Sequence, residues 1–144
     1  MDQEFKQCLE SKKIVSFARG KNLAKKELSV AKSDLSDAKA GYENERYKWA
    51  TIQGYYAMFH AARALIYSQG YREKNHYCLA VALRTLFVDE GKMDAQLVRD
   101  FLNAMNLREA ADYEAEFSQS GAKAVIASAE KFIEKAAAIL GTSE

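Results

Sequence analysis

Apolar residues recur at helical spacing along most of the chain. Between residues 21 and 40 they alternate four and three positions apart, at Ala24, Leu28, Ala31, Leu35 and Ala38. This spacing places them on one side of an α-helix, as the narrow seam that helices in bundles present to their neighbours. Lys, Asp, Glu and Ser fill most of the other positions. We therefore predict an amphipathic helix that ends at Gly41 in the left-handed conformation.

Further segments show the same periodicity. The most aromatic one runs to about residue 69, with Asn44 as the expected cap, and its apolar face carries Ile52, Tyr55, Phe59, Ala62 and Ile66. We expect later helices over residues 76 to 90, 95 to 113 and 119 to 140, with Asn75 and Asp94 capping the first two. Residues 1 to 18 show a weaker pattern, which predicts a short helix ending near Ser11 and a connection closed by Gly20.

These elements predict an all-α protein, an up-and-down helical bundle of four to five main helices plus a short N-terminal helix. The chain contains no proline and no sustained alternation of β-branched residues, so no sheet is expected. Its 144 residues suffice for one hydrophobic core and are too few for two. We divide the chain into an N-terminal extension, residues 1–18, and one bundle domain, residues 19–144.

Composition narrows the classes of partner. Twenty-one Lys and Arg nearly balance twenty Asp and Glu, for a net charge of +1. The overall charge therefore does not indicate a nucleic-acid or membrane partner, although it does not exclude a local basic patch. No segment approaches the roughly 18 to 20 apolar residues of a membrane span, and the first residues do not resemble a signal peptide. Cys8 and Cys78 lack zinc-site spacing. We expect a cytoplasmic protein with reduced thiols.

Two charged residues continue an apolar stripe. In the helix of residues 95 to 113 the stripe contains Leu97, Val98, Phe101, Leu102 and Met105. At about 100° per residue, Arg108 and Asp112 fall on the same side. Either the helix turns and they form a solvated ion pair, or they form a buried structural pair. In the third interpretation, Arg108 binds phosphate through its planar fork and Asp112 orients it.

The two histidines lie on or near the inward faces of adjacent predicted helices. His60 lies beside the aromatic stripe together with Tyr56, Arg63 and Tyr67, and His76 falls within the stripe of the next helix. Packing or capping roles explain these positions as well as a functional role does. Carboxylate-bridged metal bundles need Glu-x-x-His pairs on two facing helices, and His60, one of only two histidines in the chain, has an alanine three residues before it. We therefore expect no metal and no other cofactor.

Three stretches together resemble a known family. They are YYAMFHAARALI (55–66), GYREKNH (70–76) and LREAADYE (107–114), and they look like the HEPN domain family, in particular its small stand-alone prokaryotic branch. The resemblance covers about residues 20 to 140, which makes residues 19–144 a HEPN-like domain. It implies a helical bundle that forms a symmetric homodimer. Many relatives are encoded beside a minimal nucleotidyltransferase and act with it as a toxin–antitoxin pair.

The chain departs from the catalytic motif of that family. Active members are metal-independent endoribonucleases with an Arg-x4–6-His motif, two copies of which meet across the dimer. No histidine follows Arg108, and Arg72 and His76 are one residue too close for the motif. A carboxylate such as that of Asp112 cannot replace imidazole as both acid and base without a large pKa shift.

Two hypotheses follow from this resemblance. In the first, a dimeric HEPN-like module with a degenerate catalytic motif binds a minimal nucleotidyltransferase antitoxin and the phosphate of RNA or a nucleotide. Arg63, Arg72 and Arg108 would bind phosphate, with Asp112 orienting Arg108. Tyr56, Tyr113 and His60 would stack on a base or shape the pocket. The alternative is an active metal-independent endoribonuclease toxin that uses His60 or His76 with Arg108. Neither hypothesis involves a membrane, and the sequence leaves open whether the protein is an enzyme.

Overall fold

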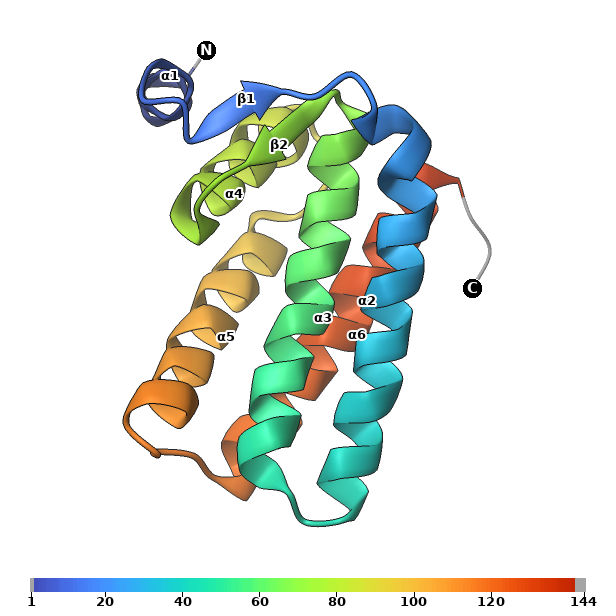
Figure 1. Ribbon diagram of the computed structural model, residues 1–144, viewed down its shortest axis with the longest axis vertical. Helices are drawn as coiled ribbons and strands as arrows, with labels where there is room; N and C mark the ends of the chain where they lie inside the picture. Colours follow the sequence, from blue (N-terminus) through green and yellow to red (C-terminus); the bar gives the residue numbers. More distant parts are fainter. Residues whose placement is uncertain (1, 142–144) are drawn as a thin grey trace.

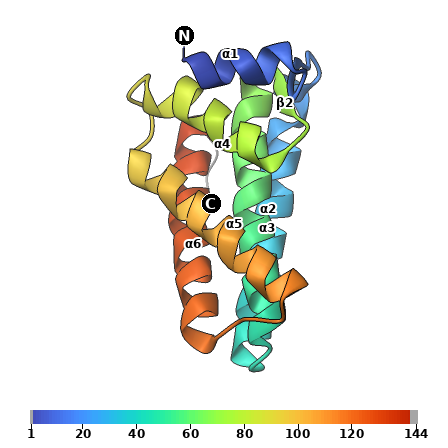
Figure 2. The same cartoon turned by 90° about the vertical axis from the view of Figure 1, so that its left-hand side faces the viewer.

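The computed structural model describes residues 2–141. Two long helices, α2 (Gly20–Glu43) and α3 (Tyr47–Ser68), form an antiparallel pair, with α3 at the centre of the molecule and α2 at one side (Figure 1). Helix α6 (Gln119–Leu140) packs behind this pair, and α5 (Ala95–Tyr113) packs obliquely against α3 (Figure 2). Helices α1 (Gln3–Glu10) and α4 (His76–Leu83) lie side by side at one end, and α4 continues as a π-helical turn, η1 (Arg84–Val88). The predicted all-α helical bundle is confirmed.

Helix α3 forms the centre of the core. All five residues of its predicted apolar stripe are buried, and it packs against α2, α5 and α6. Gly54 lets α6 approach closely, because a Cβ atom at this position would lie only 2.9 Å from Val125 Cγ1. A central helix buried on several sides is the most constrained element of such a bundle, so side chains at its edges are held firmly in place.

The helix ends follow the predicted caps in part. Asn75 Oδ1 accepts a hydrogen bond from the backbone N–H of Cys78 at 2.7 Å, and Asp94 caps α5 in the same way. The predictions for Gly41 and Asn44 were wrong: α2 continues through Gly41, and Asn44 ends α2 rather than beginning α3. Glu45, with a φ of +60°, makes the turn instead. A helical glycine is permitted wherever packing supports the helix, so glycine alone does not end one.

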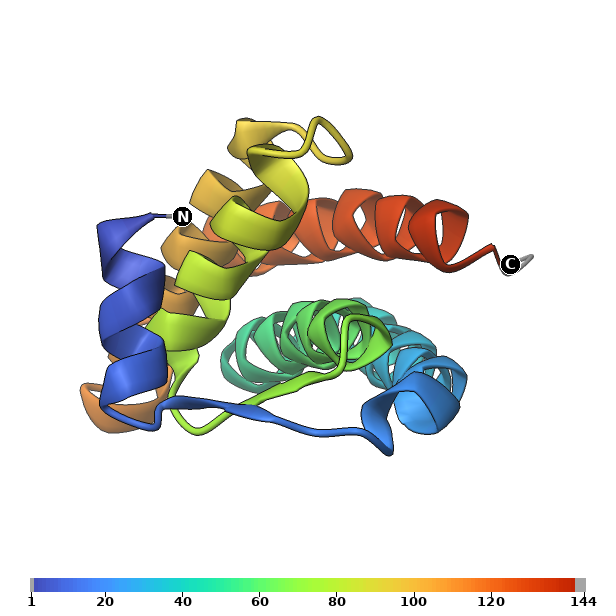
Figure 3. The same ribbon diagram turned by 90° about the horizontal axis from the view of Figure 1, so that it is seen from above.

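A short two-stranded sheet joins the N-terminal segment to the bundle, which corrects the prediction of no sheet. Strand β1 (Ile14–Ser16) pairs antiparallel with β2 (Tyr71–Glu73), with Val15 opposite Arg72. Seen from above, the two strands run side by side between α1 and the start of α2 (Figure 3). Strands of three residues are too short to produce a period-two pattern, so no hydrophobic alternation marks them in the sequence.

A disulfide bond also ties this segment down. Cys8 of α1 and Cys78 of α4 are bonded although 70 positions separate them, and their Cα atoms are 5.9 Å apart. The expectation of reduced thiols was therefore wrong. The sequence does not show this pairing, because only the fold brings the two distant cysteines together. Phe5 and Ile14 are almost fully buried as well. Residues 2–16 thus pack on the bundle beside the start of α4, while the division of the chain at residue 18 stays a prediction.

Candidate functional site

Arg108 lies where α5 meets the aromatic edge of α3. The residue is only 7% exposed, as its place on the apolar stripe predicted. Its guanidinium carbon lies 5.2 Å, 5.5 Å and 5.6 Å from the ring centroids of Tyr55, Tyr56 and Tyr113. These are cation–π distances. Nη1 donates a hydrogen bond to the Tyr113 hydroxyl at 3.3 Å, but Nε is buried without a partner. Arg108 therefore retains hydrogen-bonding capacity that the described part of the protein does not use.

Asp112 is the weaker half of the predicted inward pair. Its carboxylate lies 3.6 Å from Arg108 Nη1, but its side chain is 37% exposed. Arg108 points inward, as its position on the apolar stripe predicts, whereas Asp112 points outward; that Asp112 faces a partner protein stays a prediction. The buried residues of the second half of α5 are Phe101, Ala104, Arg108 and Ala111. Asp112 shares their side of the helix but lies in its last turn, since α5 ends at Tyr113. A single long contact with a half-exposed carboxylate neutralises the guanidinium only weakly.

His76 reaches the same cluster from the first position of α4. Its Nδ1 atom lies 2.6 Å from the hydroxyl of Tyr55, and its ring centroid lies 4.5 Å from that of Phe59. Burial, followed by the positive charge of Arg108, lowers the pKa of His76 below its usual value of 6.5. Burial also raises the pKa of the Tyr55 phenol, despite the opposing effect of Arg108. His76 is thus mainly neutral at neutral pH, and the structure brings it together with Arg108 around one tyrosine.

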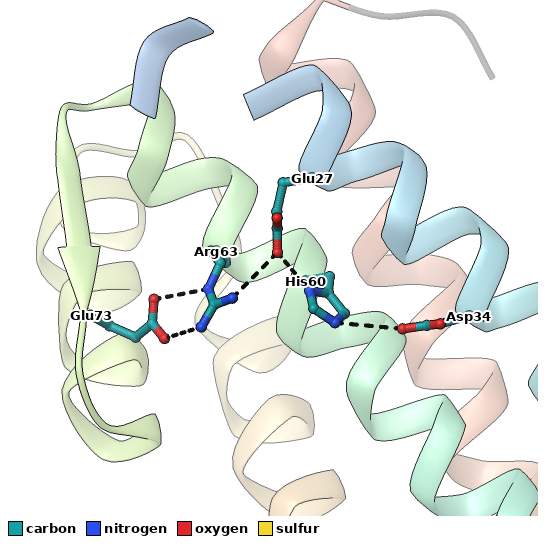
Figure 4. A network of polar contacts seen from close by, with 5 residues as sticks. All are labelled: Glu27, Asp34, His60, Arg63 and Glu73. Atoms are coloured by element: carbon teal, nitrogen blue, oxygen red, sulfur yellow. Dashed lines mark hydrogen bonds and ion pairs between the residues drawn. The ribbon is translucent and has the colours of Figure 1, made fainter. Parts of the chain in front are cut away.

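His60 and Arg63 belong to a second, carboxylate-rich cluster on the neighbouring face of α3 (Figure 4). His60 Nδ1 lies 2.6 Å from Glu27 Oε2, and its Nε2 lies 3.6 Å from Asp34 Oδ2. Arg63 donates two hydrogen bonds to Glu73, at 3.1 Å and 2.7 Å, and its Nη1 lies 3.7 Å from Glu27. Protein carboxylates therefore already occupy both side chains.

The remaining predicted residues lie at the margins of these clusters. Tyr113 is 74% exposed although its hydroxyl contacts Arg108, and Tyr56 is half-buried beside the same guanidinium. Arg72 lies on β2, with its guanidinium carbon 5.6 Å from the centroid of the Phe17 ring. Arg72 therefore packs on the segment that precedes α2 and not on the tyrosines around Arg108.

Sequence reasoning missed Tyr55 as a site residue and missed all three carboxylates of the second cluster. Tyr55 sits in the apolar stripe of α3 and was assigned to the core, where it does lie, at 0% exposure. The missed signal is its hydroxyl, because a buried phenol needs a hydrogen-bond partner. The partners of His60 and Arg63 come from α2 and β2, and only tertiary packing brings those elements together.

Among residues 2–141, no group of three or more His, Cys, Asp or Glu side chains is arranged to hold a metal ion. Within the same range, none of the helices combines the length and hydropathy of a membrane span.

Comparisons with known proteins identify the relatives of the chain. The family model described as "HEPN domain" matches residues 24–139. "Putative toxin MJ0605" of Methanocaldococcus jannaschii is 32% identical over 109 residues, which cover 75% of this chain and 81% of that protein. A "UPF0332 protein" of Thermotoga maritima is 29% identical over 87% of this chain and 89% of its own length. "Putative toxin MJ0142" of Methanocaldococcus jannaschii is 28% identical over 67% of this chain and 66% of its own length.

Proposed function

Because this chain belongs to the HEPN domain family, we propose that it is a dimeric helical module that binds the phosphate of a nucleotide or RNA at Arg108. We further propose that it works with a minimal nucleotidyltransferase in a toxin–antitoxin-type system. Two of its relatives carry the word toxin in their names. The single observation that carries the phosphate proposal is that the Arg108 guanidinium is buried and incompletely hydrogen-bonded.

That guanidinium is buried, charged and incompletely paired. Its Nε has no acceptor among the described residues, and its nearest carboxylate oxygen is 3.6 Å away. The three tyrosine rings offset part of the cost of burying the charge, but ring faces do not accept hydrogen bonds well. A phosphate oxygen would bind at Nη2, which has no partner among the described residues and, unlike Nε, is not one of their fully enclosed unpaired atoms; the arginine fork matches phosphate geometry. The exposed ring of Tyr113 and the half-buried ring of Tyr56 offer faces on which a base can stack.

The arrangement supports binding more than catalysis. The histidine of the family motif is missing after Arg108. His60 could act as an acid or base only after leaving Glu27, and Arg63 could bind phosphate only after leaving Glu73. We therefore place the ligand at Arg108 and not at the carboxylate-rich cluster of Figure 4.

One observation favours the second candidate, a metal-independent endoribonuclease. His76 and Arg108 both contact Tyr55, so a histidine from another helix stands near the arginine. Its lowered pKa keeps the imidazole neutral at neutral pH, as a general base requires. In this candidate His76 takes a ribose hydroxyl proton and Arg108 stabilises the charge on phosphorus.

One assay separates the two candidates. The purified protein is incubated with end-labelled RNA in EDTA and analysed on native and denaturing gels. The binding module retards the RNA and leaves it intact. Cleavage that His76→Ala abolishes and that Arg99→Ala, at an exposed arginine of α5, leaves in place would establish the ribonuclease instead. RNA that is neither retarded nor cut would contradict both candidates.

The homodimer and the partner protein need tests of their own. Trp49, Tyr113 and Phe117 are large aromatic side chains that are more than half exposed, and aromatic residues of this kind are enriched at protein interfaces. We expect light scattering to give the mass of a dimer at micromolar concentration, and a monomer would contradict the proposed homodimer. For the partner, we expect the neighbouring reading frame to encode a small nucleotidyltransferase that copurifies with this chain.

A further inference from the structure

The hydroxyl of Tyr55 has a single hydrogen-bond partner among residues 2–141. The residue is 0% exposed, and its hydroxyl lies 2.6 Å from His76 Nδ1. A buried hydroxyl that donates no hydrogen bond is costly, so the direction of this contact can be worked out. If Nδ1 carried a proton, Tyr55 would have to accept it, and the phenolic proton would then have no acceptor. Tyr55 therefore donates to Nδ1, and the proton of neutral His76 lies on Nε2.

The Nε2 atom of His76 is available to a ligand. It has no hydrogen-bond partner among the described residues. The unpaired side-chain atoms that are fully enclosed in this part of the chain are Thr85 Oγ1 and Arg108 Nε, and His76 Nε2 is not among them. The imidazole edge that carries Nε2 therefore reaches solvent, while Tyr55 holds the opposite edge inside the core.

We propose that Tyr55 is a positioning residue, which fixes His76 as a neutral Nε2–H donor so that His76 and Arg108 bind the phosphate of a nucleotide or RNA together. The ligand in this inference rests on the proposed function, whereas the tautomer of His76 does not. Tyr55 performs both tasks because its ring lies against Arg108 and its hydroxyl meets His76.

This tautomer has a consequence for catalysis. With the Nδ1 lone pair occupied and a proton on Nε2, His76 can donate a hydrogen bond but cannot take a proton from a ribose hydroxyl. Burial and then the positive charge of Arg108 lower the pKa of His76, against the opposing effects of Glu73 and Glu109, which favours the neutral ring. The site is therefore built for holding an anion.

The sign of one pKa change tests the inference. Histidine signals of the 15N-labelled protein are titrated by NMR in the wild type and in Tyr55→Phe. The chain has only two histidines, so His60→Gln assigns them. A hydrogen bond donated to Nδ1 stabilises the neutral ring, so its loss raises the pKa of His76. Tyr67→Phe is the matched control. It removes a phenol hydroxyl from the same helix, but the ring of Tyr67 packs on Phe17.

A rise in the pKa of His76 in Tyr55→Phe, with no change in Tyr67→Phe, supports the inference. A fall would overturn it, because a phenol that accepts from Nδ1–H stabilises the imidazolium and leaves Nε2 as a base. Direct observation of a proton on Nδ1 in the wild type would overturn it as well, whether or not Tyr55→Phe folds.

Inorganic phosphate tests the role of the donor. We expect it to shift the His76 signals, and we expect His76→Ala to weaken its binding about tenfold, the usual effect of losing one hydrogen bond to a charged group. If RNA binds but His76→Ala changes neither affinity, the donor role is wrong and the proposed function stands. If neither phosphate nor RNA binds the wild type, the proposed function is wrong, and the pKa result still decides the role of Tyr55.

Discussion

The Nδ1 atom of His76 lies 2.6 Å from the hydroxyl of Tyr55, although the two residues come from different helices and are 21 positions apart. Arg108, from a third helix, lies over the same tyrosine ring. Helices α3, α4 and α5 thus converge on one buried side chain, with one cationic and one neutral donor around it. This convergence is what distinguishes the Arg108 cluster from the carboxylate-rich cluster around His60.

The lowered pKa of His76 predicts that the protein loses stability as the pH falls. The unfolded chain binds a proton near pH 6.5, the ordinary value, whereas the folded chain binds it only at lower pH. The unfolded state therefore takes up more protons on acidification, and the free energy of unfolding falls below about pH 6.5. We expect urea denaturation at a series of pH values to show a smaller decline in His76→Gln. Identical pH dependence in the two proteins would contradict the lowered pKa.

The ion pair of Arg63 and Glu73 predicts a large effect of a single substitution. The Glu73 side chain is only 4% exposed, so Arg63→Ala would leave a buried carboxylate without its partner. We expect a loss of about 3–5 kcal/mol in the free energy of unfolding, measured in urea. The control is Lys39→Ala, whose partner Glu130 is half-exposed and whose loss should cost at most about 1 kcal/mol. If the two substitutions lowered the free energy of unfolding equally, the buried carboxylate of Glu73 would not need Arg63 as its partner, and this account would be contradicted.

The disulfide predicts that a reductant weakens the fold. Because Cys8 and Cys78 close a loop of about 70 residues, we expect reduction to lower the free energy of unfolding by about 2–4 kcal/mol. The urea midpoint should fall when dithiothreitol is added to the wild type and stay constant in Cys8→Ala/Cys78→Ala. Two reactive thiols in the native purified protein would contradict this account.

The fold was predictable because each long helix carries its own apolar stripe. The stripes of α2, α3, α5 and α6 are regular over several turns, and each needs a partner face. The small sheet and the disulfide were not predictable in the same way. Ile14–Ser16 and Tyr71–Glu73 are too short for a pattern, and Cys8 meets Cys78 only after α1 has packed on α4.

The candidate site was predictable one residue at a time but not as an assembly. The sequence alone predicted that Arg108 points inward, because a charged residue at the helical spacing of an apolar stripe lies on the same side of the helix as that stripe. The pairing of His76 with Tyr55 depends on how α4 crosses α3, which no local pattern encodes. The same limit applies to His60, whose partner Glu27 lies 33 positions away.

The central claim, that the Arg108 guanidinium binds phosphate, is tested most directly by RNA affinity. Fluorescence anisotropy with a labelled RNA oligonucleotide compares the wild type with Arg108→Ala and with Arg99→Ala, which removes an exposed arginine from the same helix. Arg108→Lys keeps the charge and removes the planar fork. We predict binding at least about tenfold weaker in Arg108→Ala, an intermediate value in Arg108→Lys and no change in Arg99→Ala. Wild-type affinity in folded Arg108→Ala would contradict the claim.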